Sequence, residues 1–225
     1  MSLIIRTENI DRDFISGRET VHALKNVNIK IERGMLTILR GRSGSGKTTL
    51  INLLGALDYP TKGKVFFDDK DITHMHQTER DELRRKDMGF IFQSVALISL
   101  MSAYENVEFA LRIAGFGLKE RRDRASECLN LVGLAKRMTH RPGELSGGEQ
   151  QRVAIARAIS HKPKIVFADE PTAELDTAMG IQVVGIFRKL IEIEGVTIVM
   201  TTHDPSMLDL ADRVYTLEDG EIINE

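Results

Sequence analysis

One glycine-rich segment, GRSGSGKT at residues 41–48, constrains the fold more than any other part of the sequence. It fits the pattern G-x-x-x-x-G-K-[ST], follows the apolar run LTILR and precedes TTLINLLGAL, which has helix-forming composition. In such a segment the glycines let backbone N–H groups surround phosphates, Lys47 reaches the β and γ oxygens, and Thr48 can hold Mg²⁺. This order of strand, loop and helix predicts a P-loop that binds a nucleoside triphosphate, not a turn that matches by chance. The residues expected to contact the nucleotide here are Gly41, Arg42, Ser43, Gly44, Ser45, Gly46, Lys47, Thr48 and Thr49.

The hydrophobic pattern predicts an α/β fold with two kinds of strand. Residues 26–32, NVNIKIE, alternate as a half-buried strand does, and with the opening segment and residues 65–72 they indicate an antiparallel layer. Continuous apolar runs favour parallel strands buried on both faces. Such runs lie at residues 36–39, 89–92, 165–168 and 196–200, with helical patterns between them, and an Asp219-Gly220 turn predicts a hairpin near the end.

A mostly helical segment interrupts this pattern between about residues 78 and 162. Ser102 and Glu105 form a predicted capping box, and the basic cluster KERRDR at 119–124 is expected to be a solvated helix face. We therefore expect one domain over residues 1–225. Its core is predicted at about 1–83 and 163–225, with a helical subdomain at about 84–162.

Polar residues end several of the predicted strands. Asp169 and Glu170 follow the apolar strand IVFA, and carboxylates at the carboxyl ends of parallel strands face the same crevice as a P-loop. Asp169 is the expected Mg²⁺ partner, and Glu170 the expected base toward an attacking water. His203 follows another strand, and Gln93 ends GFIFQ, where it could contact Mg²⁺ or that water.

A second glycine-rich segment, ELSGGEQQR, lies about a hundred residues after the first. Ser146, Gly147 and Gly148 expose backbone N–H groups before a helix-forming run, which predicts a second anion cradle. Ser146 and Glu149 also fit a capping box for that helix, and both readings can hold at once.

Composition limits the classes of partner. The formal charge of −2 supplies no global field that attracts nucleic acid, and the lone Cys128 is expected to be a packing residue in a reducing compartment. No run approaches the ~20 apolar residues of a membrane span, and the first residues do not resemble a signal peptide. We expect a cytoplasmic protein that reaches a membrane only through a partner.

Taken together, GRSGSGKT, Gln93, LSGGEQQR, IVFADE and His203 resemble the ATP-binding subunit of ABC transporters over essentially the whole chain. The resemblance implies a P-loop NTPase with a RecA-like parallel-sheet core, an antiparallel β layer and an inserted helical subdomain. It implies an ATPase that uses ATP and Mg²⁺ and forms a head-to-tail dimer, most simply a homodimer. In that dimer Ser146, Gly147, Gly148 and Glu149 serve the nucleotide of the other subunit.

The resemblance also implies a membrane permease as partner, and hence a place on the inner face of the cell membrane. Residues 89–111 resemble the subfamily for lipoprotein release, macrolide export and antimicrobial-peptide resistance, to which a cell-division subunit also belongs. Phe14 falls where an aromatic ring stacks on adenine, and Glu174 stands in the loop that crosses between subunits. The expected permease contact includes an apolar set that is either exposed or core: Val95, Leu97, Ile98, Leu100 and Met101.

Two alternatives to a transporter differ from it in what the ATP cycle drives. One is a regulatory module that uses the same ATP cycle on a membrane partner without moving a substrate. The other is an ABC-type ATPase acting on DNA or the ribosome, which the single cassette and mildly acidic balance disfavour.

Overall fold

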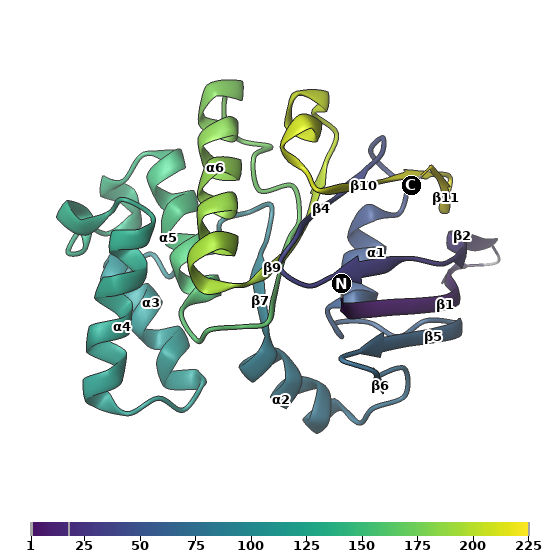
Figure 1. Cartoon of the computed structure of the whole chain (residues 1–225), viewed down its shortest axis with the longest axis horizontal. Coiled ribbons are helices and arrows are strands. Elements are labelled where there is room, and N and C mark those ends of the chain that lie inside the picture. The colour runs from purple at the N-terminus through teal and green to yellow at the C-terminus, as the bar shows by residue number, and fades with distance from the viewer. Residues whose placement is uncertain (1, 18, 225) are drawn as a thin grey trace.

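A six-stranded, mostly parallel sheet runs through the centre of the computed structural model, which describes residues 2–17 and 19–224 (Figure 1). Its strand order is β11-β10-β4-β9-β8-β7, and only the β10–β11 hairpin at one edge is antiparallel. The predicted Asp219-Gly220 turn joins that hairpin, and both residues have positive φ. The strands are β4 (Leu36–Arg40), β7 (Met88–Ile91), β8 (Ile165–Ala168), β9 (Thr197–Thr202), β10 (Arg213–Glu218) and β11 (Glu221–Asn224).

The central strands are buried on both faces, as their unbroken apolar sequences predicted. Successive side chains of a strand point to opposite faces of the sheet, so each strand contributes side chains to two hydrophobic clusters. In β8, Val166 joins one hydrophobic cluster and Phe167 the other; in β9, Met200 and Val199 divide in the same way. The first cluster lies under α6 and the helical subdomain, and the second under α1 and the antiparallel layer.

The predicted antiparallel layer is a five-stranded sheet built around β1. Residues 26–32 form parts of two strands, not the single predicted one. Asn26 has φ of 49° and accepts a hydrogen bond on its carbonyl from the Asn28 side chain, which interrupts the strand after Val27. The strands are β1 (Leu3–Ser16), β2 (Glu19–Val27), β3 (Lys30–Glu32), β5 (Lys62–Phe67) and β6 (Lys70–Asp71).

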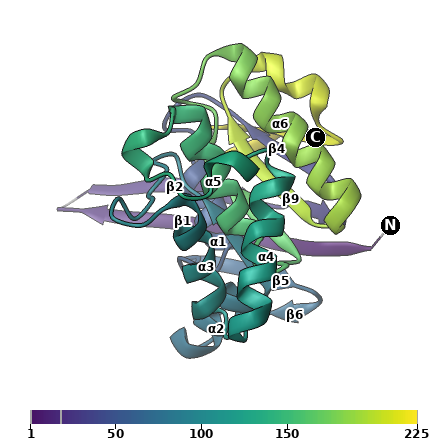
Figure 2. The same ribbon diagram turned by 90° about the vertical axis from the view of Figure 1, so that its left-hand side faces the viewer.

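The helices divide between the sheet and a separate group. In Figure 2 the α3, α4 and α5 group faces the viewer, and α6 lies beside the sheet. β7 pairs with β8 at the edge of the large sheet, and the helical subdomain at about residues 84–162 stays a prediction. The α-helices are α1 (Lys47–Leu54), α2 (Gln77–Asp87), α3 (Ala103–Ile113), α4 (Leu118–Leu131), α5 (Gly147–Ile159) and α6 (Thr177–Glu194). Short 3₁₀ turns are η1 (Ala135–Arg137), η2 (Pro142–Glu144) and η3 (Pro205–Leu210).

The predicted solvated face at residues 119–124 is wrong for Arg124. Its side chain is only 5% exposed and forms an ion pair with Glu194 of α6 at 2.9 Å. It also donates to the Ile159 and Ser160 carbonyls at the end of α5. Burial opposes the charge on the guanidinium, yet the hydrogen bond with Glu194 and its companions raise the pKa of Arg124. Arg124 therefore ties the helical subdomain to the core.

Two smaller expectations concern Cys128 and membrane spans. Cys128 is fully buried, and burial raises the pKa of its thiol to about 12, which suits a packing residue. Within residues 2–17 and 19–224, no helix has the length and apolar character needed to cross a bilayer.

Candidate nucleotide-binding site

The glycine-rich segment forms a loop between β4 and the start of α1. Gly44 and Gly46 have φ of 81° and 103°, in the region that favours glycine. A Cβ at Gly46 would lie 2.6 Å from the Ala23 carbonyl oxygen, so β2 packs against the loop backbone. Lys47 Nζ donates to the carbonyls of Gly41 and Arg42, both at 2.9 Å. Its ammonium is therefore held inside the curve of the loop.

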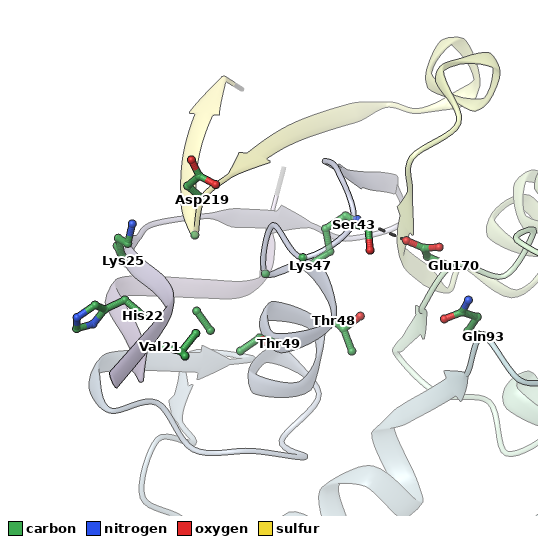
Figure 3. A pocket seen from close by; sticks show the side chains of 14 residues that line it. Val21, His22, Lys25, Ser43, Lys47, Thr48, Thr49, Gln93, Glu170 and Asp219 are labelled. Carbon is green, nitrogen blue, oxygen red and sulfur yellow. Dashed lines mark ion pairs between the residues drawn. The ribbon is translucent and has the colours of Figure 1, made fainter. Parts of the chain in front are cut away.

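A cavity of about 580 Å³ opens over this loop (Figure 3). Thr48, Gln93 and Glu170 lie at one end of it, and His22 and Lys25 of β2 lie at the other. The β2 side chains and the β10–β11 turn were not predicted to take part, since their sequences carry no recognisable motif. The predicted residues that line the cavity are Ser43, Gly44, Gly46, Lys47, Thr48, Thr49, Gln93 and Glu170; Val21, His22, Ala23, Lys25, Asp219 and Gly220 complete the wall.

Glu170 stands between two basic side chains at this cavity. Its Oε1 lies 3.4 Å from Lys47 Nζ, and its Oε2 lies 3.3 Å from His203 Nδ1. The Glu170 side chain is 19% exposed and its φ is 45°, an uncommon value for a non-glycine residue. A carboxylate held this way beside a phosphate cradle is suited to accept a proton from a water molecule.

Asp169 and Glu170 are both fixed by Thr201, a residue that sequence reasoning missed. The Thr201 hydroxyl donates to Asp169 Oδ1 at 2.7 Å and accepts from the Glu170 backbone N–H at 2.8 Å. Thr201 is fully buried near the end of β9. The sequence feature that could have indicated its role is the polar pair Thr201-Thr202, which ends a mostly apolar run just before His203.

The oxygen groups predicted to hold Mg²⁺ come from three elements. Thr48 lies on α1 and Gln93 follows β7, and both line the cavity. Asp169 follows β8 and is half-buried, with Oδ1 engaged by Thr201. Hydroxyl, amide and carboxylate oxygens are the hard donors that Mg²⁺ prefers, and it retains several waters in addition. The donor set therefore fits a magnesium ion.

Other predicted residues lie outside this cavity. A second cavity of about 560 Å³, called here the outer cavity, shares Ser43, Gly44 and Asp219 with the first. It is also lined by Gly41, Arg42, Ser45 and His203 among others. Phe14 lines neither cavity; its ring is 41% exposed and carries the Arg12 guanidinium 4.3 Å above it. Phe14 does pair across the sheet with Val21, which lines the first cavity, so its contact with adenine stays a prediction.

The second glycine-rich segment begins α5 and does not line the P-loop cavity. Ser146 caps the helix: it accepts from the Glu149 N–H at 3.3 Å, and Glu149 accepts from the Ser146 N–H at 2.9 Å. This confirms the capping box. None of the four residues predicted to serve a nucleotide here, Ser146, Gly147, Gly148 and Glu149, lines either cavity.

The apolar set at residues 95–101 is neither fully core nor fully exposed. Ile98 is 38% exposed and Leu100 is 80% exposed, whereas Val95, Leu97 and Met101 are half-buried. Arg157 donates to the Val95 and Ala96 carbonyls, and Asn106 bonds both the N–H and the carbonyl of Ile98. The set is thus divided: Leu97 packs against the first hydrophobic cluster, whereas Ile98 and Leu100 are exposed.

Comparisons with known proteins agree with this geometry. An uncharacterized ABC transporter ATP-binding protein of Methanocaldococcus jannaschii is 44% identical over 220 residues, covering 98% of both chains. The macrolide export ATP-binding/permease protein MacB of Neisseria gonorrhoeae is 46% identical over 222 residues, which are 99% of this chain and 34% of MacB. A solved dimeric ATP-binding cassette in a post-hydrolysis state, bound to ADP and Pi, superposes with a TM-score of 0.90 at 40% identity, covering 98% of this chain and 97% of that one.

The family model that matches residues 24–173 is that of the ABC transporter family. This range includes the P-loop, Gln93, the start of α5, Asp169 and Glu170, and it ends before His203. The α/β architecture and the parallel sheet are those of the solved cassettes. The chain belongs to the ABC transporter family, as an ATP-binding subunit with ATPase activity.

Proposed function

We propose that two copies of the chain close head to tail around two ATP·Mg²⁺ and that ATP hydrolysis reopens them. The observation that carries this proposal is the separation of the two glycine-rich segments. The P-loop and Glu170 line one cavity, while Ser146 at the start of α5 lines neither that cavity nor the outer one. An exposed helix N-terminus is an anion site, and a second copy offers it a γ-phosphate.

In the closed dimer each predicted site residue would have a distinct task. The P-loop N–H groups and Lys47 bind the phosphates, and Glu170 accepts the proton of the attacking water. His203, which lies 3.3 Å from Glu170, orients that carboxylate and faces the γ-phosphate. Thr48, Gln93 and Asp169 would hold Mg²⁺, which neutralises phosphate charge when bound. Closure also excludes water and brings Ser146 to the partner's nucleotide.

The partner that receives this motion is proposed to be an integral membrane permease. The relative named macrolide export ATP-binding/permease protein supports this, since the chain spans about a third of its length. The exposed Ile98 and Leu100 of the segment at residues 95–101 offer a surface for such a partner. The subunit would then lie on the inner face of the cell membrane. A macrolide, lipoprotein or antimicrobial peptide is the proposed class of substrate.

The test uses the Glu170→Gln protein, tagged and trapped with ATP·Mg²⁺ in its native cell, and identifies copurifying membrane proteins. A permease supports the proposal, and drug or peptide export assays with that permease then separate transport from signalling without transport. Recovery of ribosomes or DNA with no permease contradicts the transporter role. The matched control is Lys47→Ala in the same background, which should recover no ATP-dependent partner.

A further inference from the structure

The loop of residues 173–176 and the start of α5 form one continuous face of the molecule. A Cβ at Gly147 would lie 4.0 Å from Leu175 Cδ2, and one at Gly148 would meet the end of Met179. The loop itself is fixed: the Leu175 N–H donates to the Thr172 carbonyl at 3.1 Å, and the Asp176 side chain caps the Met179 N–H at 2.9 Å. A surface that contacts Ser146 therefore also meets the 173–176 loop.

Glu174 is the acid on this face whose carboxylate is unengaged. Glu149 pairs with Arg137 and accepts from Ser146, and Asp176 accepts from Met179. The Glu174 side chain is exposed and has no ion-pair or hydrogen-bond partner among residues 2–17 and 19–224. It therefore presents a free negative charge beside the cap of α5.

A matching positive charge lies on the P-loop. Arg42 is exposed, lines the outer cavity, and its guanidinium has no partner within the described part of the chain. Arg40 adds a second exposed cation to the same lining, where Glu218 and Asp219 of the β10–β11 hairpin are the acids. Only the backbone carbonyl of Arg42 is engaged, by Lys47 and Ser45. A carboxylate brought to this part of the loop meets an uncompensated guanidinium.

We infer that Glu174 of each subunit forms an ion pair with Arg42 of the partner subunit when two copies close. This inference rests on the proposed head-to-tail dimer and adds the side chains that select a second copy of this same chain. Head-to-tail closure brings Ser146 to the partner's P-loop, and the 173–176 loop moves with it. In a two-fold interface every such contact occurs twice, so two identical pairs form.

The pair contributes selectivity and association rate more than raw affinity. An exposed ion pair is weak by itself and is screened by salt. Opposite charges on two approaching faces nevertheless favour the correct encounter, and like charges oppose wrong partners. A different cassette that lacks either Glu174 or Arg42 would lose one of the two pairs, and one with a reversed charge at either position would add repulsion. The proposed pair would therefore favour a second copy of this chain over a cassette without these two residues.

The experiment measures dimer dissociation constants by sedimentation with ATP·Mg²⁺, in proteins that all carry Glu170→Gln. Reversal of one charge, as Glu174→Lys or Arg42→Glu, places like charges opposite each other twice, and we expect about tenfold or greater weakening at ~0.05 M salt. An equimolar mixture of the two variants restores dimers, because the heterodimer contains one reversed pair and one original pair. Glu192→Lys makes the same charge change at an exposed position on α6 and serves as the control.

The possible outcomes distinguish failure of the head-to-tail dimer from failure of the Glu174–Arg42 ion pair. A parent protein that stays monomeric with saturating ATP·Mg²⁺ overturns the head-to-tail dimer and the ion pair together. A parent that dimerises, with Glu174→Lys as tight as Glu192→Lys, overturns the ion pair alone. Restoration by the doubly substituted chain but not by the mixture places the pair within one subunit and also overturns it. Binding of a fluorescent ATP analogue to monomeric Glu174→Lys, within about twofold of the parent, excludes a loss of folding.

Discussion

Glu170 Oε1 lies 3.4 Å from Lys47 Nζ, so the proposed base and the phosphate-binding lysine share one ion pair. Their charges compensate each other at the bottom of the cavity, where Lys47 is buried. We expect an arriving phosphate to compete for the ammonium and to free the carboxylate for a water molecule. The two residues are therefore coupled. Substitution of Glu170 should slow hydrolysis, whereas substitution of Lys47 should weaken ATP binding.

Glu170→Gln removes the base and keeps the shape of the side chain. We expect ATP turnover to fall by about 10²- to 10⁴-fold, because an amide does not accept the proton of the attacking water. ATP binding should persist, and the protein should accumulate as a dimer. Phosphate release and gel filtration with saturating ATP·Mg²⁺ measure both effects. Unreduced turnover would show that another residue is the base.

Lys47→Ala removes the charge held between the Gly41 and Arg42 carbonyls. A hydrogen bond to a charged group contributes about 1.5 to 3 kcal/mol, so ATP affinity should fall about 10- to 100-fold. Calorimetric titration gives the affinity directly. Lys62→Ala, at a side chain that is 74% exposed, is the control and should bind as the parent does. Equal affinities for the two variants would contradict the P-loop assignment.

Ser146→Arg tests whether the start of α5 serves another subunit. The long side chain leaves the subunit's own cavity unobstructed, since Ser146 does not line it. We expect monomers to bind ATP normally while steady-state turnover falls to background, because closure is blocked. Ser99→Arg introduces the same side chain at an exposed serine elsewhere and should retain turnover. A turnover equal to the parent's would refute the two-segment mechanism.

Glu194→Ala removes the carboxylate that pairs with the buried guanidinium of Arg124. Breaking a buried pair leaves an uncompensated charge, and we expect a loss of about 3 kcal/mol in the free energy of unfolding. Glu127 also contacts Arg124 but is 56% exposed, so Glu127→Ala should cost under about 1 kcal/mol. Urea unfolding monitored by circular dichroism compares the two variants. Equal losses would mean that Glu194 is not the anchor.

His161 makes stability depend on pH. Burial lowers the pKa of His161, although the hydrogen bond to the Met88 carbonyl at 3.0 Å opposes the shift. Below the ordinary histidine pKa of about 6.5, the unfolded chain takes up a proton that the folded chain resists, so stability falls as pH falls. His161→Gln keeps an N–H donor without titrating. Its loss of stability between about pH 7.5 and pH 5.5 should be smaller than the parent's.

The sequence predicted the parts of the site that depend on local backbone geometry. The P-loop, the capping boxes at Ser102 and Ser146 and the Asp219-Gly220 turn each depend on a few neighbouring residues, and the structure has the two capping boxes and the turn as predicted. Thr201 could not be found this way, because its role depends on β8 and β9 lying side by side. The same limit applies to Val21 and Lys25, which reach the cavity only through the folding of β2 over the P-loop.

Arg124 shows that local sequence does not predict which charged residue of a helix is buried. In KERRDR every residue is charged, and nothing in the segment distinguishes the one that faces inward. Its partner Glu194 lies 70 residues later, at the end of a helix whose packing the local sequence does not specify. The division of residues 26–32 between two strands was missed for a similar reason, since it depends on side-chain bonds that join Asn28 to Asn9 and Asn26.

Asn106 bonds to the backbone of Ile98, Met101 and Ser102, and Arg157 bonds to Val95 and Ala96. The chain that leaves the cavity at Gln93 thus enters a segment whose backbone is held by several side-chain hydrogen bonds. These bonds would resist bending of the backbone between Gln93 and Leu100, so we expect a displacement at Gln93 to move this segment largely as one piece. The exposed Leu100 would then carry any movement that begins near the end of β7 to the surface of the molecule.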